Sequence, residues 1–247
     1  VTIVRRSRQF EGLTPEGERV LASARRLLHE VEGLHQDLAS RTGEPCGRLL
    51  LGAVPTALPI AARFATRLQL RHRGLQVVLR SFSSQALESG LENLALDLAL
   101  GFWQRPEVAA RRLQVLPQYA ERYFLVRREP GHAGARRLGP ACPWHEAAAQ
   151  DLVLLTPEMH HRAIVDQAFA GTGATVRPVL ETDSVLAVLQ AVLDGSATGR
   201  LAAVLPGALV GTVADLPGLL VRPLLEPLVE TPIGWMSAPL PQPSPAL

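Results

Sequence analysis

Small hydroxyl side chains stand at three points of the sequence where an apolar run gives way to a helix-like segment. These points are Pro55-Thr56-Ala57, Ser81-Phe82-Ser83-Ser84 and Leu155-Thr156-Pro157. The first turn of a helix has backbone N–H groups without partners, and its positive dipole end favours negative charge. A nearby hydroxyl adds a further donor, so such junctions suit a carboxylate or another small oxyanion. The pattern therefore predicts a binding site for a small anion.

A simpler interpretation of the same junctions stays open. Ser and Thr are preferred N-caps, so Thr56, Ser83 and Thr156 could each satisfy only the helix that follows. Two further residues are candidates by position: Phe102 follows an apolar run and could form an apolar wall, and His160 begins an expected helix. The complete candidate set for ligand binding is Pro55, Thr56, Ala57, Ser81, Ser83, Ser84, Phe102, Thr156 and His160.

The sequence carries no motif of the common enzyme classes: no nucleophile elbow, no phosphate-binding GxxxxGK(S/T) loop and no HExxH. His160 and His161 are adjacent, so on a helix they point about 100° apart, and neither has a ligating partner four residues on. Cys46 and Cys142 lie far apart and make no metal-ligand spacing, as isolated thiols in a reducing compartment do. We therefore expect no catalysis, no metal and no cofactor.

A long amphipathic helix is predicted ahead of these junctions. Thr14-Pro15-Glu16 supplies a hydroxyl cap, a proline for the first turn and an acid near the positive helix end. Apolar residues then recur at alternating steps of four and three, which is the a/d seam of a coiled coil. The seam residues are Val20, Ala24, Leu27, Val31, Leu34 and Leu38.

A helix from residue 15 to residue 40 is close to 40 Å long, at about 1.5 Å per residue, and is too long to fold back on a small domain. We expect its apolar stripe to pair with a second copy of the chain, in a homodimer or homotetramer. The alternative is an amphipathic helix that lies on its own domain. Thr42, Gly43, Pro45 and Gly47 then interrupt the helical pattern.

Beyond this break, short apolar runs alternate with helical patterns, which predicts an α/β fold. The expected strands are residues 49–54, 75–82, 96–101, 152–156, 176–181 and 201–205. The expected helices are residues 56–71, 84–93, 158–170 and 184–194. Several strands lack polar interruptions, which is typical of parallel strands covered on both faces. An irregular stretch containing Pro117 and Pro130 divides the pattern into two series, so we expect two lobes.

The basic residues are all arginines, although the net charge is only +2 at pH 7. Arg5, Arg6 and Arg8 stand among the first ten residues without a neighbouring acid. Because arginine makes bidentate contacts to phosphate, this cluster suits contact with nucleic acid. The alternative is an ordinary solvated terminus.

No apolar run reaches the roughly 20 residues needed to span a bilayer, and the N-terminus lacks the order of a secretory signal. We therefore expect a cytoplasmic protein that makes no contact with a membrane. The sequence begins without Met in an expected strand, and we expect further residues to precede it.

Residues 8–28 resemble the junction between the wing and the linker helix of LysR-type transcriptional regulators. The element Leu-Thr-x-x-Gly-Glu carries the likeness, here as Leu13, Thr14, Gly17 and Glu18. Residues 47–52 (Gly-Arg-Leu-Leu-Leu-Gly) and 96–101 (Leu-Asp-Leu-Ala-Leu-Gly) resemble the first and third sensor strands of the family. Beyond residue 101 the agreement is in topology.

The resemblance implies an α/β fold in which a long N-terminal linker helix precedes a two-lobed effector-binding domain like that of periplasmic binding proteins. Residues 1–13 are then the remnant of a DNA-binding wing, and residues 14–42 are the dimerising helix. Separately, the Pro-rich composition of residues 239–247 predicts a disordered tail. Residues 47–120 and 222–238 are expected to form sensor lobe I, and residues 121–221 sensor lobe II.

The resemblance also implies that the protein is a DNA-binding transcriptional regulator and that this chain supplies dimerisation and effector sensing. A small-molecule effector is expected between the lobes, at the carboxyl ends of the strands. In the family a winged helix-turn-helix precedes the wing, so the recognition helix is expected to be missing here. Arg5, Arg6 and Arg8 could then contact DNA phosphates or the minor groove without distinguishing bases.

Two other functions fit a two-lobed architecture. A solute-binding protein of a transporter has the same cleft, but it carries an export signal and has no heptad helix. A two-lobed α/β enzyme needs a buried titratable pair in the cleft, which a sequence cannot reveal. The heptad helix and the arginines at the start of the chain favour the regulator.

Overall fold

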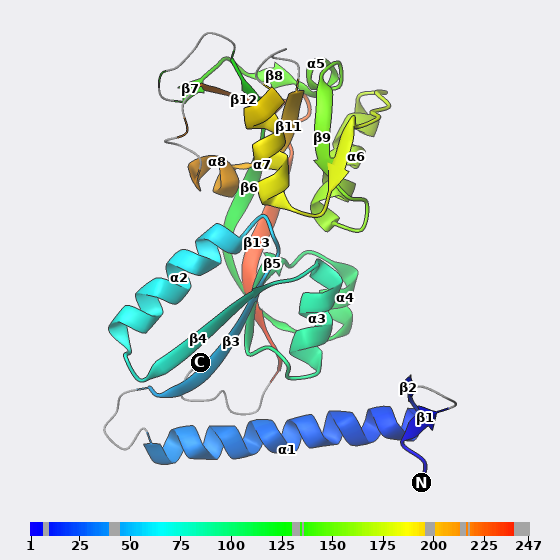
Figure 1. Ribbon diagram of the computed structural model, residues 1–247, viewed down its shortest axis with the longest axis vertical. Helices are drawn as coiled ribbons and strands as arrows, with labels where there is room; N and C mark the ends of the chain where they lie inside the picture. The colour runs from blue at the N-terminus through cyan, green and yellow to red at the C-terminus, as the bar shows by residue number, and fades with distance from the viewer. Residues whose placement is uncertain are drawn as a thin grey trace.

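The computed structural model describes residues 1–6, 10–39, 45–129, 134, 136–195, 201–212, 216 and 218–239. The side chains at positions 6, 10, 32 and 35–39 lie outside this description. The described chain forms a hairpin, one long helix and two α/β lobes stacked above that helix (Figure 1).

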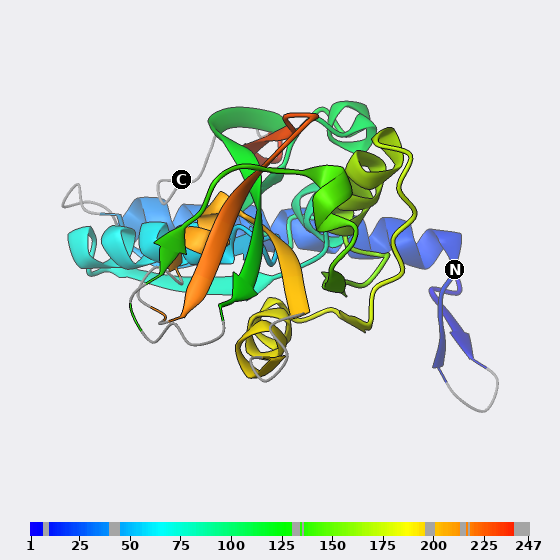
Figure 2. The ribbon, with the colours of Figure 1, turned by 90° about the horizontal axis from the view of Figure 1, so that it is seen from above.

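A hairpin and the predicted long helix lie at the N-terminal end (Figure 2). β1 (Val4–Arg6) pairs antiparallel with β2 (Phe10–Leu13), and α1 spans Pro15–Ala39. The Gly17 N–H donates to Thr14 Oγ1 at 3.0 Å, so Thr14 caps the helix as expected. A Cβ at Gly17 would stand 2.0 Å from the Ile3 carbonyl oxygen. Only glycine therefore lets the segment before β1 pass so close to the helix.

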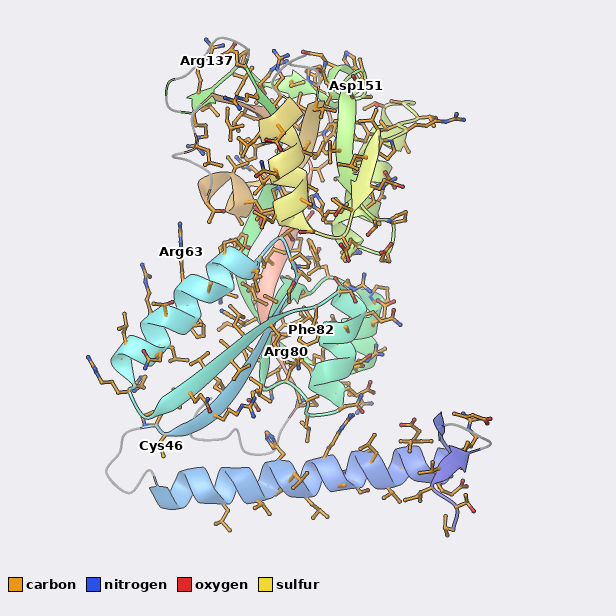
Figure 3. All side chains as sticks on the ribbon, viewed as in Figure 1. Cys46, Arg63, Arg80, Phe82, Arg137 and Asp151 are labelled. Carbon is orange, nitrogen blue, oxygen red and sulfur yellow. The ribbon has the colours of Figure 1, made fainter. Side chains whose placement is uncertain are left out.

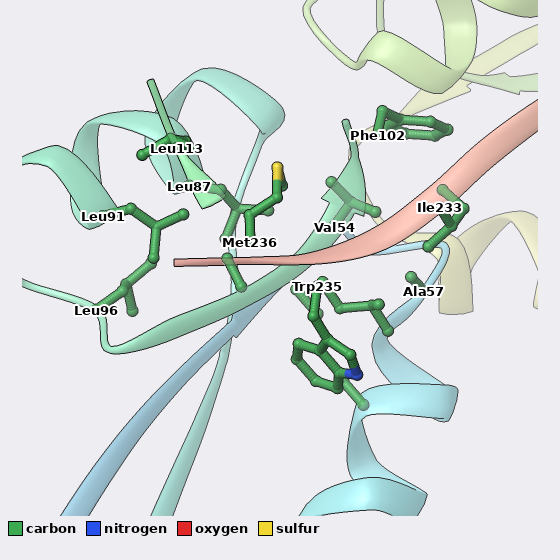
Figure 4. Packing of buried hydrophobic residues seen from close by; sticks show 14 of the residues in the cluster. Val54, Ala57, Leu87, Leu91, Leu96, Phe102, Leu113, Ile233, Trp235 and Met236 are labelled. Carbon is green, nitrogen blue, oxygen red and sulfur yellow. The ribbon is translucent and has the colours of Figure 1, made fainter. Parts of the chain in front are cut away.

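Lobe I is built on three parallel strands. They are β3 (Gly47–Ala53), β4 (Leu75–Ser81) and β5 (Leu98–Phe102), with β3 in the middle. Its helices are α2 (Leu58–Arg71), α3 (Ser84–Glu92) and α4 (Pro106–Ala110). Apolar side chains from both faces of this sheet form its core, as Figure 4 shows around Trp235 and Met236.

Lobe II repeats the parallel pattern with β9 between β10 and β11. These strands are β9 (Asp151–Leu155), β10 (Leu180–Thr182) and β11 (Leu201–Pro206). The helices are α5 (Trp144–Ala147), α6 (His160–Gly171), α7 (Val185–Asp194) and α8 (Gly207–Thr212). Separate apolar clusters cover the two faces of this sheet, one centred on Trp144 and Phe169 and the other on Val188 and Leu205.

A long strand joins the two lobes. β6 (Gln114–Arg128) pairs antiparallel with β13 (Glu230–Ser237) in lobe I and with β11 and β12 (Leu219–Leu225) in lobe II. β7 (Arg137–Leu138) and β8 (Cys142–Pro143) pair with β12. The chain returns to lobe I after Leu225, so the expected boundary at residue 222 falls inside β12.

Two expectations about strands were wrong. The stretch around Pro117, expected to be irregular, is part of β6, where antiparallel pairing with the distant β13 accommodates it. The expected strand at residues 176–181 shortens to Leu180–Thr182, because Pro178 has no N–H to donate and the strand has a neighbour on one side only. Because β6 and β13 pair antiparallel with their neighbours, the sheet is mixed rather than parallel throughout.

Candidate functional site

A small pocket lies where the two lobes meet, and six of the nine predicted ligand residues line it. Lobe I contributes the turn before α2, the start of α3 and the end of β5, while lobe II contributes the end of β9 and the start of α6. The pocket volume is about 10 Å³, room for roughly one water molecule. The lining residues are Val54, Pro55, Thr56, Ser83, Ser84, Phe102, Leu155, Met159, His160 and His161.

Three predicted residues do not line this pocket. Ala57 is fully buried at the N-cap of α2. Ser81 is exposed at the end of β4. Thr156 is half-buried after β9, and its backbone N–H donates to the Thr182 carbonyl at 3.0 Å. The fold therefore brings together Thr56, Ser83 and Ser84 of lobe I with His160 of lobe II.

The structure distinguishes capping hydroxyls from the others. Ser83 is the N-cap of α3, and its Oγ accepts the Ala86 N–H at 3.3 Å. The N-caps of α2 and α6 are Ala57 and Met159, and neither side chain caps its helix. Thr56 therefore does not cap α2, and the first turns of α2 and α6 reach the lobe junction without a side-chain cap.

Two buried polar atoms of the pocket have no hydrogen-bond partner among the described residues: Ser84 Oγ and His161 Nδ1. Ser84 is 7% exposed and His161 is 4% exposed. A buried polar group left without a partner costs about 1–3 kcal/mol. A ligand with its own donors and acceptors would recover this cost, so the pocket suits a polar molecule.

His161 offers the pocket an acceptor. Its Nε2 donates to the Val204 carbonyl at 3.2 Å, since a carbonyl oxygen can only accept. Burial lowers the pKa of His161 to about 4, so the ring is neutral near pH 7 and Nδ1 keeps its lone pair. The ring stacks on Tyr123 with centroids 5.6 Å apart. His161 is therefore held in one orientation and one tautomer.

Arg105 lies beside the pocket and joins the lobes, although sequence reasoning did not single it out. It is the N-cap of α4; its Nε donates to Glu88 Oε1 at 2.6 Å and its Nη1 to His160 Nδ1 at 2.8 Å. Phe102 packs edge-on against the His160 ring, with centroids 4.8 Å apart. Glu88 and Arg105 are 17 positions apart and on different elements, so no local pattern could have revealed the pair.

A second pocket, about 180 Å³ in volume, opens beside the first. Both pockets are lined by Ser84, Met159 and His160. The remaining residues around this outer pocket are Gln85, Arg105, Pro157, Glu158 and Ala163. The side chain of His160 thus borders an almost filled inner pocket and a larger outer one.

The two adjacent histidines serve different neighbours. His160 accepts from Arg105, whereas His161 donates to the backbone of β11. Within the described residues no group of three or more His, Cys, Asp or Glu side chains could hold a metal ion. No helix in the described part of the chain is long and apolar enough to cross a membrane.

The predicted seam of α1 faces away from the rest of the chain. Val20, Leu27, Val31 and Leu34 are 51–68% exposed, and Ala24 is exposed as well. The Leu38 side chain lies outside the described residues. The other side of α1 faces lobe I, where His29 Nδ1 lies 3.9 Å from Asp97 Oδ1. Figure 3 shows side chains of α1 projecting away from both lobes.

The predicted DNA-contact arginines are only partly placed. Arg5 is exposed on β1. Arg6 is on the same strand with its side chain outside the described residues, and Arg8 lies outside them altogether. The role of all three in DNA contact stays a prediction.

Comparisons with known proteins agree with this architecture. A family model described as the LysR substrate binding domain matches residues 42–247. The HTH-type transcriptional activator AaeR of Escherichia coli (strain K12) is 29% identical over 118 residues, which are 47% of this chain and 38% of AaeR. Quorum-sensing regulator A of Escherichia coli O157:H7 matches to the same extent. The match thus spans less than half the length of these relatives.

Solved structures share the fold at low sequence identity. CbnR in complex with its target DNA has a TM-score of 0.67 and 16% identity, and the likeness covers 99% of this chain and 81% of CbnR. A full-length OxyR variant from Pseudomonas aeruginosa has a TM-score of 0.70 and 20% identity, with 100% of this chain and 76% of OxyR covered. The family model spans most of the sequence, and we conclude that the protein belongs to the LysR family of transcriptional regulators.

Proposed function

We propose that this chain is the dimerising and effector-sensing part of a DNA-binding transcriptional regulator. A small anionic molecule binds between the lobes and changes their relative orientation. The long helix pairs with a second copy of the chain and transmits this change to the DNA-binding part of the whole protein. Such a protein works in the cytoplasm, which fits a sequence without a secretory signal order at its N-terminus.

The convergence at the lobe junction carries the proposal. Thr56 and Ser83 of lobe I and His160 of lobe II are far apart in sequence but line one pocket. Ligands of open α/β sheets bind at the carboxyl ends of strands, and this pocket lies at the ends of β3, β5 and β9. A ligand that contacts both lobes can favour one arrangement of the lobes over another, which regulation requires.

Anionic chemistry is supported by the donors around the pocket. The first turns of α2 and α6 carry partial positive charge and lack side-chain caps. Buried Thr56 adds a hydroxyl group, and so does Ser84, whose Oγ has no hydrogen-bond partner among the described residues. A carboxylate accepts several such hydrogen bonds at once, whereas a cation could use none of the N–H groups.

Pairing of α1 and DNA binding rest on separate observations. The exposed stripe from Val20 to Leu34 is apolar and regular, as a coiled-coil seam is. The similar fold of CbnR was solved on its target DNA, which supports DNA as the partner of the whole protein. Arg5, exposed on the hairpin, supports a contact to phosphate.

A titration with acetate, and with acetamide as its neutral analogue, tests the effector site. We expect acetate to perturb the backbone NMR signals around Thr56 and acetamide to leave them unchanged. Thr56→Val should weaken acetate binding about tenfold, as the loss of a hydrogen bond to a charged group does. Thr66→Val, on the exposed side of the same helix, is the matched control. Equal acetate affinity in both variants would remove Thr56 from the site.

A further inference from the structure

We propose that Arg105 selects a carboxylate ligand, and that His160 occupies the place of that carboxylate as a latch between the lobes. The proposal rests on the proposed function, because it concerns the ligand and the opening of the same inter-lobe pocket. It assigns the latch to one hydrogen bond, from Arg105 Nη1 to His160 Nδ1 at 2.8 Å.

Acidic side chains of lobe I contact Arg105 and fix its position. Buried Glu88 accepts from its Nε at 2.6 Å, and Glu107 Oε2 lies 3.4 Å from its Nη2. Glu88 also lies 4.0 Å from Arg111 Nη1, and the Nε of that arginine donates to Glu92 at 2.9 Å. This network fixes the guanidinium plane, so that Nη1 points toward lobe II. A fixed guanidinium edge is suited to recognise a planar carboxylate.

His160 meets Arg105 as an acceptor. Arginine keeps its protons, so His160 Nδ1 must present a lone pair and the ring proton must be on Nε2. A guanidinium binds a carboxylate more strongly than it binds a neutral ring nitrogen, because a carboxylate acceptor also carries a negative charge. A carboxylate that reaches the cleft therefore displaces the histidine from Arg105.

The pocket volumes require such a displacement. The inner pocket holds about 10 Å³, so no organic acid fits beside the rings of Phe102 and His160. The outer pocket of about 180 Å³ reaches Arg105 and shares the His160 wall. Movement of the His160 side chain joins the two spaces and at the same time breaks its contacts with Arg105 and Phe102. Ligand entry therefore removes these two contacts between lobe I and lobe II.

Protonation opens the same latch. The ionisable groups near His160 are Arg105 and Glu107 on the α4 segment, Glu88 on α3, Glu158 before α6, and His161. Burial and the Arg105 charge lower the pKa of His160, and Glu107 opposes them. A proton on Nδ1 removes the acceptor and places a second positive charge beside Arg105. The latch therefore stays closed above the ordinary histidine pKa, about 6.5, and opens as the pH falls through the lowered value.

Nitrogen-15 NMR of labelled histidines in the full chain tests the latch without any effector. The His160 signals are assigned by their loss in His160→Ala, and His145→Ala, at an exposed site on α5, is the matched control. We expect His160 to show the Nε2–H tautomer and to titrate below about pH 6.5. Arg105→Gln should raise its midpoint toward that value, while Arg67→Gln, exposed on α2, should not. An ordinary midpoint in the wild type, unchanged by Arg105→Gln, would overturn the latch.

A titration with acetate tests whether a carboxylate displaces His160 from Arg105. Saturating acetate at constant ionic strength should raise the His160 midpoint, and acetamide should not. Arg105→Gln should weaken acetate binding at least about tenfold, as the loss of a charge-assisted hydrogen bond does. His160→Ala should strengthen it several-fold, because the competing acceptor is gone. Acetate that binds through Thr56 without moving His160 refutes the latch but leaves the proposed function intact, whereas failure of Thr56 to matter refutes the site itself.

Discussion

The lobe junction and the outer face of α1 depart from ordinary burial in opposite ways. At the junction, polar atoms of Ser84 and His161 are buried without partners among the described residues. On α1, Leu27 and Leu34 are large apolar side chains that are more than half exposed. In both lobes, apolar clusters cover the two faces of the sheet.

The direction of each departure indicates what kind of partner each surface suits. Buried polar groups gain from a molecule that brings hydrogen bonds, so the junction suits a small polar ligand. Exposed apolar groups in a heptad pattern gain from a surface that removes them from water, so α1 suits a second helix. Places where a folded chain breaks a local rule are where function is to be expected.

The largest effect is expected at the helix. Leu27→Asp combined with Leu34→Asp places charges at seam positions that pairing would desolvate. The dimer dissociation constant should rise at least a thousandfold, about 4 kcal/mol, as measured by sedimentation equilibrium.

The control for this variant keeps the change in charge and moves it off the seam. Arg19→Ala combined with Arg26→Ala also lowers the net charge by two, at exposed positions of the same helix. We expect this control to dissociate like the wild type. If the two aspartates leave the mass unchanged, α1 is not the pairing surface.

The second-largest effect is expected at the lobe junction, where acid should lower the stability of the folded chain. The folded-state pKa of His161 is lowered to about 4 by burial, so the folded chain resists its protonation. Neutral His161 contributes fully to the free energy of unfolding above about pH 6.5, and this contribution is lost as the pH falls toward 4. The total loss is about 3 kcal/mol. Urea unfolding at pH 7, 5.5 and 4.5 measures this loss.

The variant His161→Gln sharpens the same measurement. Glutamine can still donate to the Val204 carbonyl but does not titrate, so the slope of stability against pH should become smaller. A slope equal to that of the wild type would assign the acid sensitivity to other groups.

A smaller and opposite effect is expected at Ser84. Ser84→Ala removes a buried hydroxyl without a partner among the described residues, so the free energy of unfolding should rise by about 1 kcal/mol. Acetate binding should become weaker at the same time. A loss of stability in thermal unfolding would mean that the hydroxyl already has a partner in the ligand-free protein.

The smallest effect concerns the hairpin. Arg5→Gln should weaken sequence-independent binding to double-stranded DNA severalfold at low salt and reduce the salt slope by about one. Fluorescence anisotropy at several salt concentrations measures both quantities. An unchanged slope would show that Arg5 makes no phosphate contact.

The sequence predicted the elements formed by local patterns. The alternating spacing of Leu27, Val31 and Leu34 indicated α1, and the Thr14 cap located its start. The apolar runs of β3, β4 and β5 and the helices between them were found within a few residues of their ends. All of these depend on near neighbours in the chain.

Features that depend on distant pairing were missed. β6 pairs with β13 more than 100 positions away, and Pro117 within it reads locally as an interruption. For the same reason, the sequence identified Thr56, Ser83 and His160, which lie at helix starts. It did not identify Arg105, because the role of Arg105 depends on its contacts with Glu88 and His160.

The passage of the chain between the lobes decides what kind of signal the pocket can send. In the described chain two segments connect the lobes: β6, and the return from β12 to β13. β6 and β13 lie side by side from the pair Arg122–Glu230 to the pair Gln114–Ser237. Two-stranded ribbons twist more than wide sheets do, and the covalent backbone limits how far an extended strand can reach. If the proposed latch opens, this ribbon would allow lobe II to rotate, and a partner subunit in contact with lobe II would detect the state of the pocket as an angle.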